Sequence, residues 1–470
     1  MKSCGRSLST GPMVAAFALL TGFGLSISLA APVAAATGAA SQKDSVRAAG
    51  STGRIAVHGP GGRRTVRLSN GMDGAEADGN STELAISGQG RRLAFTSAAT
   101  NLVPDDTNGV ADVFVVEAAS GAIRRVSVTS AGGQVGGSVS EPAISANGRY
   151  VAFTSTSPDL VPDDTNAQSD VFVRDLRRGT TRRVSVGAGN AQATGFSATP
   201  SLSADGRYVA FTSWAADLVP GDTNEVGDVF VRDLRRGTTI RVSVASDGTQ
   251  ADNVRYSYEP QISASGRYVV FTSFATNLVP DDTNFGSDIF VHDARTGATV
   301  RASIGSDGSQ STGGIRGFIN QHPSISADGR VVAFDSLGDG LLAEPPLHRA
   351  DSYVHDLKTG LTQRVALGPG GVVGNSGGAN PTVSANGRYV VFESYAENLV
   401  SGDTNSAYDV FVRDLREQVT TRVSVGAGGQ ADSFSSTGVI SANGRHVGFV
   451  SAATNLVADD NNGLVDVFLR

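Results

Sequence analysis

The residues best suited to chemistry in this sequence lie in an oxygen-rich phrase, NLVPDDTN, which occurs at 101–108 and again at 277–284. Four near copies read DLVPDDTN, DLVPGDTN, NLVSGDTN and NLVADDNN. An Asp, an Asn and a second Asp stand at relative positions 1, 3 and 7, an alternation of hard oxygen donors that calcium loops also use. In the two identical copies the predicted calcium ligands are Asp106, Asn108, Asp112, Asp282, Asn284 and Asp288.

A second interpretation makes the phrase a structural part. Position 5 carries no constant donor, since it is Val110 in one copy and Gly286 in another, and no glutamate closes the loop. The fifth copy, LGDGLLAEPPLHRA, lacks the first donors altogether. Asp and Asn side chains also accept hydrogen bonds from backbone amides in tight turns. Calcium is therefore the one cofactor that the sequence suggests, and the alternative is a loop that only builds the fold.

The phrase belongs to a long repeat whose core, SANGRYVAFTS from Ser145, occurs in seven versions. The glycines of this core recur every 57 to 63 residues. Each period holds four short apolar runs, rich in branched and aromatic residues and separated by Gly, Asn and Asp, which is the pattern of strands and turns. Seven four-stranded units predict an all-β fold, a seven-bladed β-propeller.

The two ends of the repeat predict how the ring closes. The last copy stops at DVFLR, residues 466–470, without a fourth strand, whereas residues 64–69, RTVRLS, resemble one. We expect this N-terminal strand to complete the last blade, because a closed ring leaves no open sheet edge. The predicted propeller domain covers residues 63–470.

The chain before the propeller has the features of an export signal. Lys2 and Arg6 precede an apolar run that ends in three alanines, so residues 1–36 are predicted to be a signal peptide. Residues 37–62, rich in Ala, Gly and Ser, are predicted to be a flexible lead-in. The only cysteine, Cys4, would leave with the signal, and the net charge of −7 does not favour nucleic acid. We expect a secreted or extracytoplasmic monomer, in the envelope, the periplasm or outside the cell, with no membrane span after cleavage.

The repeat resembles a known family. The core S-x-[D/N]-G-R-x-V-x-F-x-S, followed by D-[V/I]-F-V-x-D-L and T-x-R-V-S-V, is similar to the TolB-type, WD-like β-propeller repeat of bacterial exported proteins. The resemblance covers residues 64–470 and implies the propeller fold, but not the function, because one fold hosts many functions. TolB itself has six blades and a separate N-terminal domain that binds envelope partners. Seven repeats without such a domain indicate a different member.

Alternating strand direction places the DTN loops and the linkers between blades on one face of the predicted ring. Two of these linkers are longer than the others and carry aromatic and arginine side chains, the types that anchor interfaces. The predicted ligand-binding residues are Arg255, Tyr256, Tyr258, Arg316, Phe318 and His322. We expect a non-catalytic protein that binds a protein or a glycan through this loop face. Alternatively, the rings only fill the junctions between blades.

Catalytic patterns are sparse. The GNSGG motif around Ser376 satisfies G-x-S-x-G but lies in a glycine-rich linker, not on a strand-to-helix elbow. His292 and His355 replace an arginine of the third strand and are interpreted as structural. His322 and His348 fall in predicted loop regions of the fifth blade. Some seven-bladed pectate-type lyases resemble this design and use histidines around a metal, so the alternative function is a secreted metal-dependent polysaccharide lyase or hydrolase that uses the propeller pocket.

Overall fold

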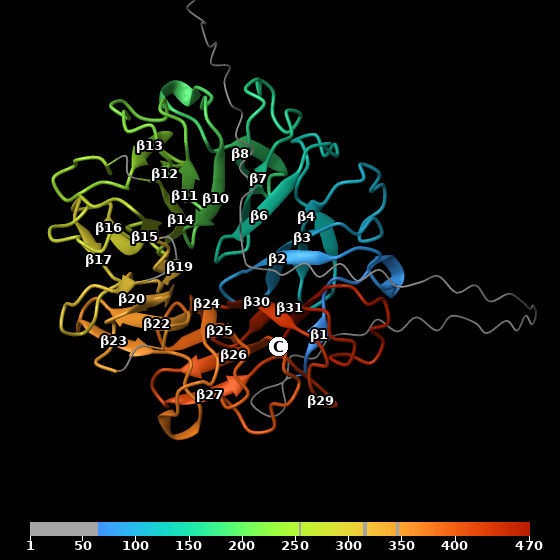
Figure 1. Ribbon diagram of the computed structural model, residues 1–470. Coiled ribbons are helices and arrows are strands. Elements are labelled where there is room, and N and C mark those ends of the chain that lie inside the picture. Colours follow the sequence, from blue (N-terminus) through green and yellow to red (C-terminus); the bar gives the residue numbers. More distant parts are fainter. Residues whose placement is uncertain (1–63, 253–254, 314–316, 345–346) are drawn as a thin grey trace, which may run out of the picture. The chain divides into compact units, whose positions relative to one another are not determined.

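The computed structural model describes residues 64–252, 255–313, 317–344 and 347–470, and these form a seven-bladed β-propeller (Figure 1). Each blade is a four-stranded antiparallel sheet whose first strand lies nearest the centre of the ring. The predicted signal peptide and the whole of the predicted lead-in lie outside the described residues. Among the residues that are described, no helix is long and apolar enough to span a membrane.

The strands of the first four blades, from inner to outer, have the following bounds: β2 (Ser81–Ile86), β3 (Arg92–Ser97), β4 (Asp112–Glu117) and β5 (Ile123–Arg125); β6 (Val139–Ile144), β7 (Tyr150–Ser155), β8 (Asp170–Asp175) and β9 (Thr180–Arg183); β10 (Ser197–Leu202), β11 (Tyr208–Ser213), β12 (Asp228–Asp233) and β13 (Thr238–Arg241); β14 (Ser257–Ile262), β15 (Tyr268–Ser273), β16 (Asp288–Asp293) and β17 (Thr299–Arg301). The remaining blades contain β19 (Asn320–Ile325), β20 (Val331–Ser336), β22 (Asp351–Asp356) and β23 (Leu361–Arg364); β24 (Gly378–Val383), β25 (Tyr389–Ser394), β26 (Asp409–Asp414) and β27 (Val419–Arg422); and β30 (Ser435–Ile440), β31 (Val447–Ser451), β32 (Asp466–Leu469) and β1 (Val66–Arg67).

The first and last strands close the ring as the sequence predicted. β1 pairs with β32 in antiparallel register, Val66 opposite Leu469 and Arg67 opposite Phe468. The N–H of Leu68 extends this pairing with a hydrogen bond of 2.8 Å to the carbonyl of Val467. The last blade therefore joins residues from the two ends of the propeller, and its β32 edge is covered.

The hydrophobic core lies between neighbouring blades. One cluster combines Val113 and Val115 of the first blade with Val151, Phe153 and Phe172 of the second, all of them buried. The two phenylalanine rings stack at 5.9 Å within their own blade. A single blade cannot cover both of its faces, so the blades depend on one another for stability.

The DTN loops add their Leu-Val pairs to this core. Leu102 is buried in a cluster with Val450, Val467 and Leu469 of the preceding blade. Because each loop must place its Leu-Val pair in this core, the loops keep a constant length in the sequence.

Every inner strand contains a β-bulge, and one residue of each bulge has a left-handed backbone conformation. The φ angles lie between 49° and 55°, although none of these residues is glycine: Glu83, Glu141, Thr199, Glu259, His322, Asn380 and Thr437. Backbone strain of this kind in non-glycine residues persists only where the surrounding structure enforces it, and it concentrates at functional sites. One of these residues, His322, lies within strand β19, so the prediction that it lies in a loop was wrong.

Candidate functional site

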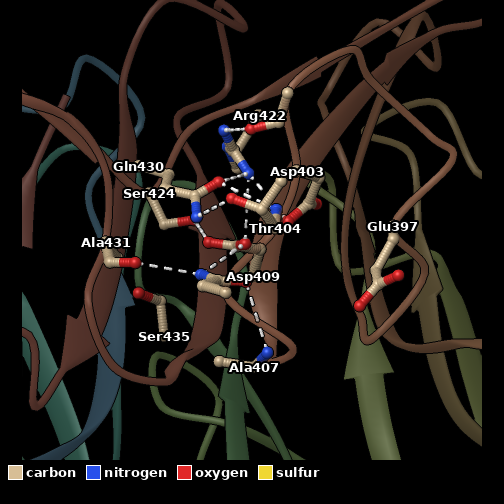
Figure 2. A network of polar contacts seen from close by, with 12 residues as sticks. Glu397, Asp403, Thr404, Ala407, Asp409, Arg422, Ser424, Gln430, Ala431 and Ser435 are labelled. Carbon is tan, nitrogen blue, oxygen red and sulfur yellow. Dashed lines mark hydrogen bonds and ion pairs between the residues drawn. The ribbon is translucent and has the colours of Figure 1, made fainter.

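The carboxylates of the DTN loops bind arginine side chains of the same blade. In the sixth blade the Nη1 of Arg422 lies 3.0 Å from Asp403 Oδ1 and 3.5 Å from Asp409 Oδ2 (Figure 2). The hydroxyl of Ser424 donates a hydrogen bond to the other oxygen of Asp409. Asp409 is fully buried, and burial raises the pKa of its carboxyl. Arg422 occupies the position from which a bound cation would neutralise both acids.

The same network recurs around the ring. Asp106 lies 3.2 Å from Arg125, and Asp282 lies 3.2 Å from Arg301. The fifth blade, which lost the first donors, keeps the arginine contact, because Arg364 binds Glu344 at 2.9 Å in their place. Every blade thus retains an ion pair between an arginine of its outermost strand and a carboxylate of the loop.

The predicted calcium ligands are consequently engaged within the protein. Asn108 points its amide nitrogen, not its oxygen, at Asp112 Oδ2 and the carbonyl of Val135, at 3.1 and 2.9 Å. Over the residues for which coordinates are described, no group of three or more His, Cys, Asp or Glu side chains is placed to hold a metal ion. Calcium binding stays a prediction, and this geometry favours the structural interpretation.

Linker residues confirm that the linkers and the DTN loops share one face. The side-chain amide of Gln134, in the linker after the first blade, donates to Asp106 Oδ1 at 2.8 Å. On this face, over the third to fifth blades, six rings form an aromatic cluster: Phe196, Trp214, Tyr256, Tyr258, Phe274 and Phe318.

The rings of the aromatic cluster contact one another in sequence across the blades. The ring centroids of Phe196 and Trp214 are 4.1 Å apart, and those of Trp214 and Tyr256 are 5.7 Å apart. Tyr256 lies 5.7 Å from Phe274, which meets Phe318 edge-on at 5.0 Å. The aromatic surface therefore crosses two blade junctions without interruption.

Arg255 lies over this surface. Its guanidinium carbon is 4.9 Å from the ring centroid of Phe274 and 5.9 Å from that of Phe318, within the range of a cation–π contact. Arg255 is exposed, Tyr256 is half-buried, and Phe274 is buried beneath them. The hydroxyl of Tyr258 is buried without a hydrogen-bond partner among the described residues, and burial raises its pKa.

Four of the six predicted ligand-binding residues thus come together: Arg255, Tyr256, Tyr258 and Phe318. Arg316 lies outside the described residues, and His322 lies on the inner strands. The sequence analysis missed Phe196, Trp214 and Phe274. Their signal was positional, because each stands directly before an inner strand or directly after a second strand of the repeat.

A second group of polar residues was also missed. We call it the inner ring: the seven left-handed residues of the inner strands together with the second-strand side chains that bind them. Glu83 Oε2 accepts the N–H of Glu141 at 2.8 Å, and Glu141 Oε2 accepts the N–H of Thr199 at 2.7 Å. Asp335 and Glu393 make the same contact to the next blade, with Asn380 and Thr437. Each of these carboxylates holds a strained bulge of its neighbour.

His322 is the only imidazole in the inner ring. Its Nδ1 lies 3.1 Å from Asp335 Oδ2, and its Nε2 lies 3.9 Å from Glu259 Oε1. Burial lowers the pKa of this imidazole, but the carboxylates of Glu259, Asp335 and Glu393 outweigh burial and raise it to about 9. His322 therefore carries a positive charge at neutral pH. The sequence signal was its fixed place, four residues before the serine of the repeat core.

The other residues considered for catalysis have ordinary surroundings. His348 is exposed, with its Nδ1 3.8 Å from Asp339. His292 and His355 contact Thr299 and Thr362 at 2.9 and 2.8 Å, as the equivalent arginines contact theirs. These contacts support the structural interpretation of both histidines.

The glycines of GNSGG also have a packing reason. A Cβ added to Gly377 would lie 1.7 Å from the carbonyl oxygen of Ala350, which only glycine avoids. Glycine is thus required at position 377 because two backbone segments approach each other closely there.

Comparisons with known proteins support the fold. No protein-family model matches the chain, and no curated protein sequence matches it. An oligogalacturonate lyase in complex with manganese is similar in structure, with 12% identity, a TM-score of 0.51, and coverage of 86% of this chain and 92% of that one. An oligogalacturonate lyase from Vibrio parahaemolyticus has a TM-score of 0.50 with the same identity and coverage. TolB from Acinetobacter baumannii is also among the similar structures, at 15% identity over 73% of this chain and 63% of that one, with a TM-score of 0.39. At 12% identity the likeness to the two lyases concerns the fold alone.

Proposed function

We propose that this protein is an extracytoplasmic, non-catalytic binding propeller that holds a protein or a glycan through the aromatic cluster on its loop face. The observation that carries the proposal is the unbroken contact of six aromatic rings across three blades. Aromatic and arginine side chains supply most of the binding energy in protein interfaces, because they present rigid apolar area with a polar edge.

The exposure of the aromatic cluster distinguishes it from the rings of the core. The paired phenylalanines inside the blades, such as Phe153 and Phe172, are fully buried. Trp214 and Tyr256 are only half-buried, and the neighbouring DTN loop presents Phe285 with 83% of its surface exposed. Rings that only filled blade junctions would not need a partly open surface beside an exposed cation, Arg255.

The lyase alternative finds no support in His322. A metal ligand or a general base must offer a neutral imidazole nitrogen. His322 lies between two carboxylates that keep it protonated, with a pKa of about 9. Its contacts fit a positively charged structural group.

The proposal is tested with purified protein against an array of glycans and against fractionated envelope and secreted proteins. Tyr256→Ala is the main variant. Phe434→Ala is the matched control, because Phe434 occupies the same repeat position in the last blade and is 41% exposed there. We expect at least tenfold weaker binding of the recovered ligand by Tyr256→Ala and unchanged binding by Phe434→Ala. Equal binding by both variants would show that the aromatic cluster is not the binding site.

A further inference from the structure

A cavity of about 400 Å³ opens between the third and fourth blades, and we call it the turn-face cavity. Its walls come from the outer strand β13, from the turn that precedes β13, and from two turns of the fourth blade, one before β15 and one after β16. These turns lie at the strand ends opposite to those that carry the DTN loops. The cavity is therefore on the other face of the propeller, and its size is that of a small-molecule site.

At the two preceding blade junctions an arginine bridges the corresponding groove. The Nη1 of Arg124 donates a hydrogen bond of 3.3 Å to the carbonyl of Leu176 in the next blade. The Nη1 of Arg182 donates one of 3.3 Å to the carbonyl of Leu234. Both arginines hold the same register position in the outer strand of their blade. Each guanidinium thus closes the groove between its own blade and the next one.

The third blade lacks this bridge. Ile240 holds the register position of Arg182, and an aliphatic side chain has no donor for the next blade. The carbonyl left without the bridge is that of Ala294, which is the counterpart of Leu234 because each of the two residues donates its N–H to the arginine before the second strand. Ile240 remains 44% exposed. The groove is therefore open at this junction and has an apolar wall.

The two carboxylates beside the turn-face cavity already have cationic partners. Asp233 accepts hydrogen bonds from Arg207 on both of its oxygens, at 3.0 and 2.6 Å. Asp293 accepts the same pair of bonds from Arg267, at 2.8 and 2.6 Å. Bidentate pairs of this kind neutralise the carboxylate and fix the guanidinium.

Two further arginines, Arg236 and Arg295, line the cavity, one from each blade, and both are exposed. Arg236 lies 3.9 Å from Asp233, which is too far for a hydrogen bond, and Arg295 forms no ion pair with any described residue. Four guanidiniums around the cavity thus face two carboxylates, an excess of two positive charges: Arg207, Arg236, Arg267 and Arg295 against Asp233 and Asp293. Such an excess attracts an anion.

Ser265 adds a neutral donor to the same cavity. It stands at the repeat position of Asp205 in the third blade, so a carboxylate is replaced here by a hydroxyl. Its oxygen accepts the backbone N–H of Arg267 at 3.3 Å, which leaves the hydroxyl hydrogen to donate to a ligand. The change from an acid to a donor favours an anion over a cation in the cavity.

The next junction, between the fourth and fifth blades, does not offer the same combination. It also lacks the bridging arginine, because Val300 holds that register position. Thr296 and Asp328, however, stand at the repeat positions of Arg236 and Ser265. The junction of the third and fourth blades therefore differs from its neighbour in joining an apolar wall with two excess arginines and a hydroxyl.

We propose that the turn-face cavity binds a carboxylate with a small aliphatic body. Arg236, Arg295 and the hydroxyl of Ser265 hold the carboxylate, since guanidinium donors match its geometry. The aliphatic body covers the exposed surface of Ile240. The ligand is either a free branched acid or the C-terminal residue of a peptide. Because this cavity and the aromatic cluster lie on opposite faces, the inference does not depend on the proposed function.

The test is calorimetric titration of the purified protein at neutral pH and low salt. The probes are isocaproate, which is leucine without its amino group, and acetyl-Gly-Leu with a free C-terminal carboxylate. Their amides, which lack the charge, are the ligand controls. We expect saturable binding of at least one acid and none of either amide. Binding of isocaproate alone identifies a free acid as the source, and binding of the peptide identifies a C-terminal residue.

Two further probes separate this proposal from its alternatives. Inorganic phosphate satisfies the arginines but places nothing on the apolar wall, and butylguanidinium would only replace the missing bridge. We expect weaker binding of phosphate than of the better acid and no binding of butylguanidinium. The proposal is overturned if neither acid binds, if phosphate binds as tightly as the better acid, or if butylguanidinium binds and the acids do not.

Two variants and one control locate the site. Ile240→Arg restores a donor for the carbonyl of Ala294 and covers the cavity, so acid binding should be lost while the fold is kept. Arg295→Gln removes one excess charge and should weaken acid binding at least about tenfold. Arg235→Gln is the matched control, because Arg235 is exposed at the same repeat position beside the junction that Arg182 bridges, and it should bind as the wild type does. Unchanged binding by Ile240→Arg or by Arg295→Gln overturns the proposal, and Arg295→Gln decides the matter if Ile240→Arg does not fold.

Discussion

The hydroxyl of Ser69 donates a hydrogen bond to the buried carboxylate of Asp466, although the two residues stand 397 positions apart in the chain. In the sixth blade the same bond joins Ser424 and Asp409, which are only 15 positions apart. Arg67 likewise lies 3.2 Å from Asp460, as Arg422 lies beside Asp403. The N-terminal strand thus supplies the last blade with the same contacts that the other blades take from their own fourth strand.

This relationship predicts the effect of Ser69→Ala. The substitution leaves a buried oxygen of Asp466 without its donor, and we expect the free energy of unfolding to fall by about 1–3 kcal/mol. Ser303→Ala removes the equivalent bond inside the fourth blade and is the matched control. Because Ser69 also fastens the closing strand, only Ser69→Ala should promote aggregation through the β32 edge. Denaturant unfolding and light scattering measure the two effects. Identical aggregation of both variants would contradict the role in closure.

Removal of calcium should leave the protein unchanged. The carboxylates of the DTN loops are paired with arginines such as Arg422, so no cation is required there. We expect less than one calcium per seven blades in dialysed protein and the same melting temperature with and without EDTA. A clear rise in melting temperature on adding calcium would instead support the prediction that the DTN loops bind calcium.

Loss of one arginine should be costly. Arg422→Met leaves the buried Asp409 and its neighbour Asp403 without their counter-charge, and uncompensated buried charges cost about 3–5 kcal/mol. Arg416→Met is the control, because Arg416 is exposed in the turn before β27. We expect a large drop in unfolding free energy for the first variant and a change within about 0.5 kcal/mol for the second. Chemical denaturation followed by fluorescence measures both, and a mild effect of Arg422→Met would show that the pair contributes little.

Substitutions at two adjacent positions of the GNSGG motif should differ in their effect on stability. Gly377→Ala places a methyl group against the carbonyl of Ala350, and overpacking of this kind costs about 1–3 kcal/mol or more. Ser376→Ala, one residue away, should leave stability and ligand binding unchanged. Thermal unfolding distinguishes the two variants. A loss of function with intact stability in Ser376→Ala would instead revive a nucleophilic role.

His322 should make stability depend on pH. Its pKa rises from 6.5 to about 9 on folding, so the protonated imidazole stabilises the fold fully below pH 6.5, and this stabilisation is lost as the pH rises through 9. We expect the melting temperature of His322→Gln to lie furthest below that of the wild type near pH 6 and to approach it near pH 9.5. His348→Gln, which changes an exposed side chain, should differ little from the wild type at either pH. A gap for His322→Gln that stays constant with pH would show that its charge is not used.

The sequence by itself determined the number of blades, the four strands of each and the closing strand. These features follow from local alternation and from turn residues such as Gly148, whose N–H closes a turn onto Ser145 at 2.8 Å with a φ of 67°. A pattern that repeats within one blade can be seen in the chain without knowledge of the ring. The aromatic linkers could be chosen on residue type alone, and the structure brought four of the six chosen residues together.

Only the tertiary structure decided which polar groups face one another. Glu83 and Glu141, one repeat apart, meet because neighbouring inner strands converge on the axis of the ring, and no local pattern encodes that convergence. The same holds for the arginine that meets each DTN loop and for the charge of His322, which carboxylates of its own blade and of the two neighbouring blades maintain against the effect of burial. Strands form from local preferences, whereas the partner and the protonation state of a buried polar side chain are set by all the groups that the fold gathers around it.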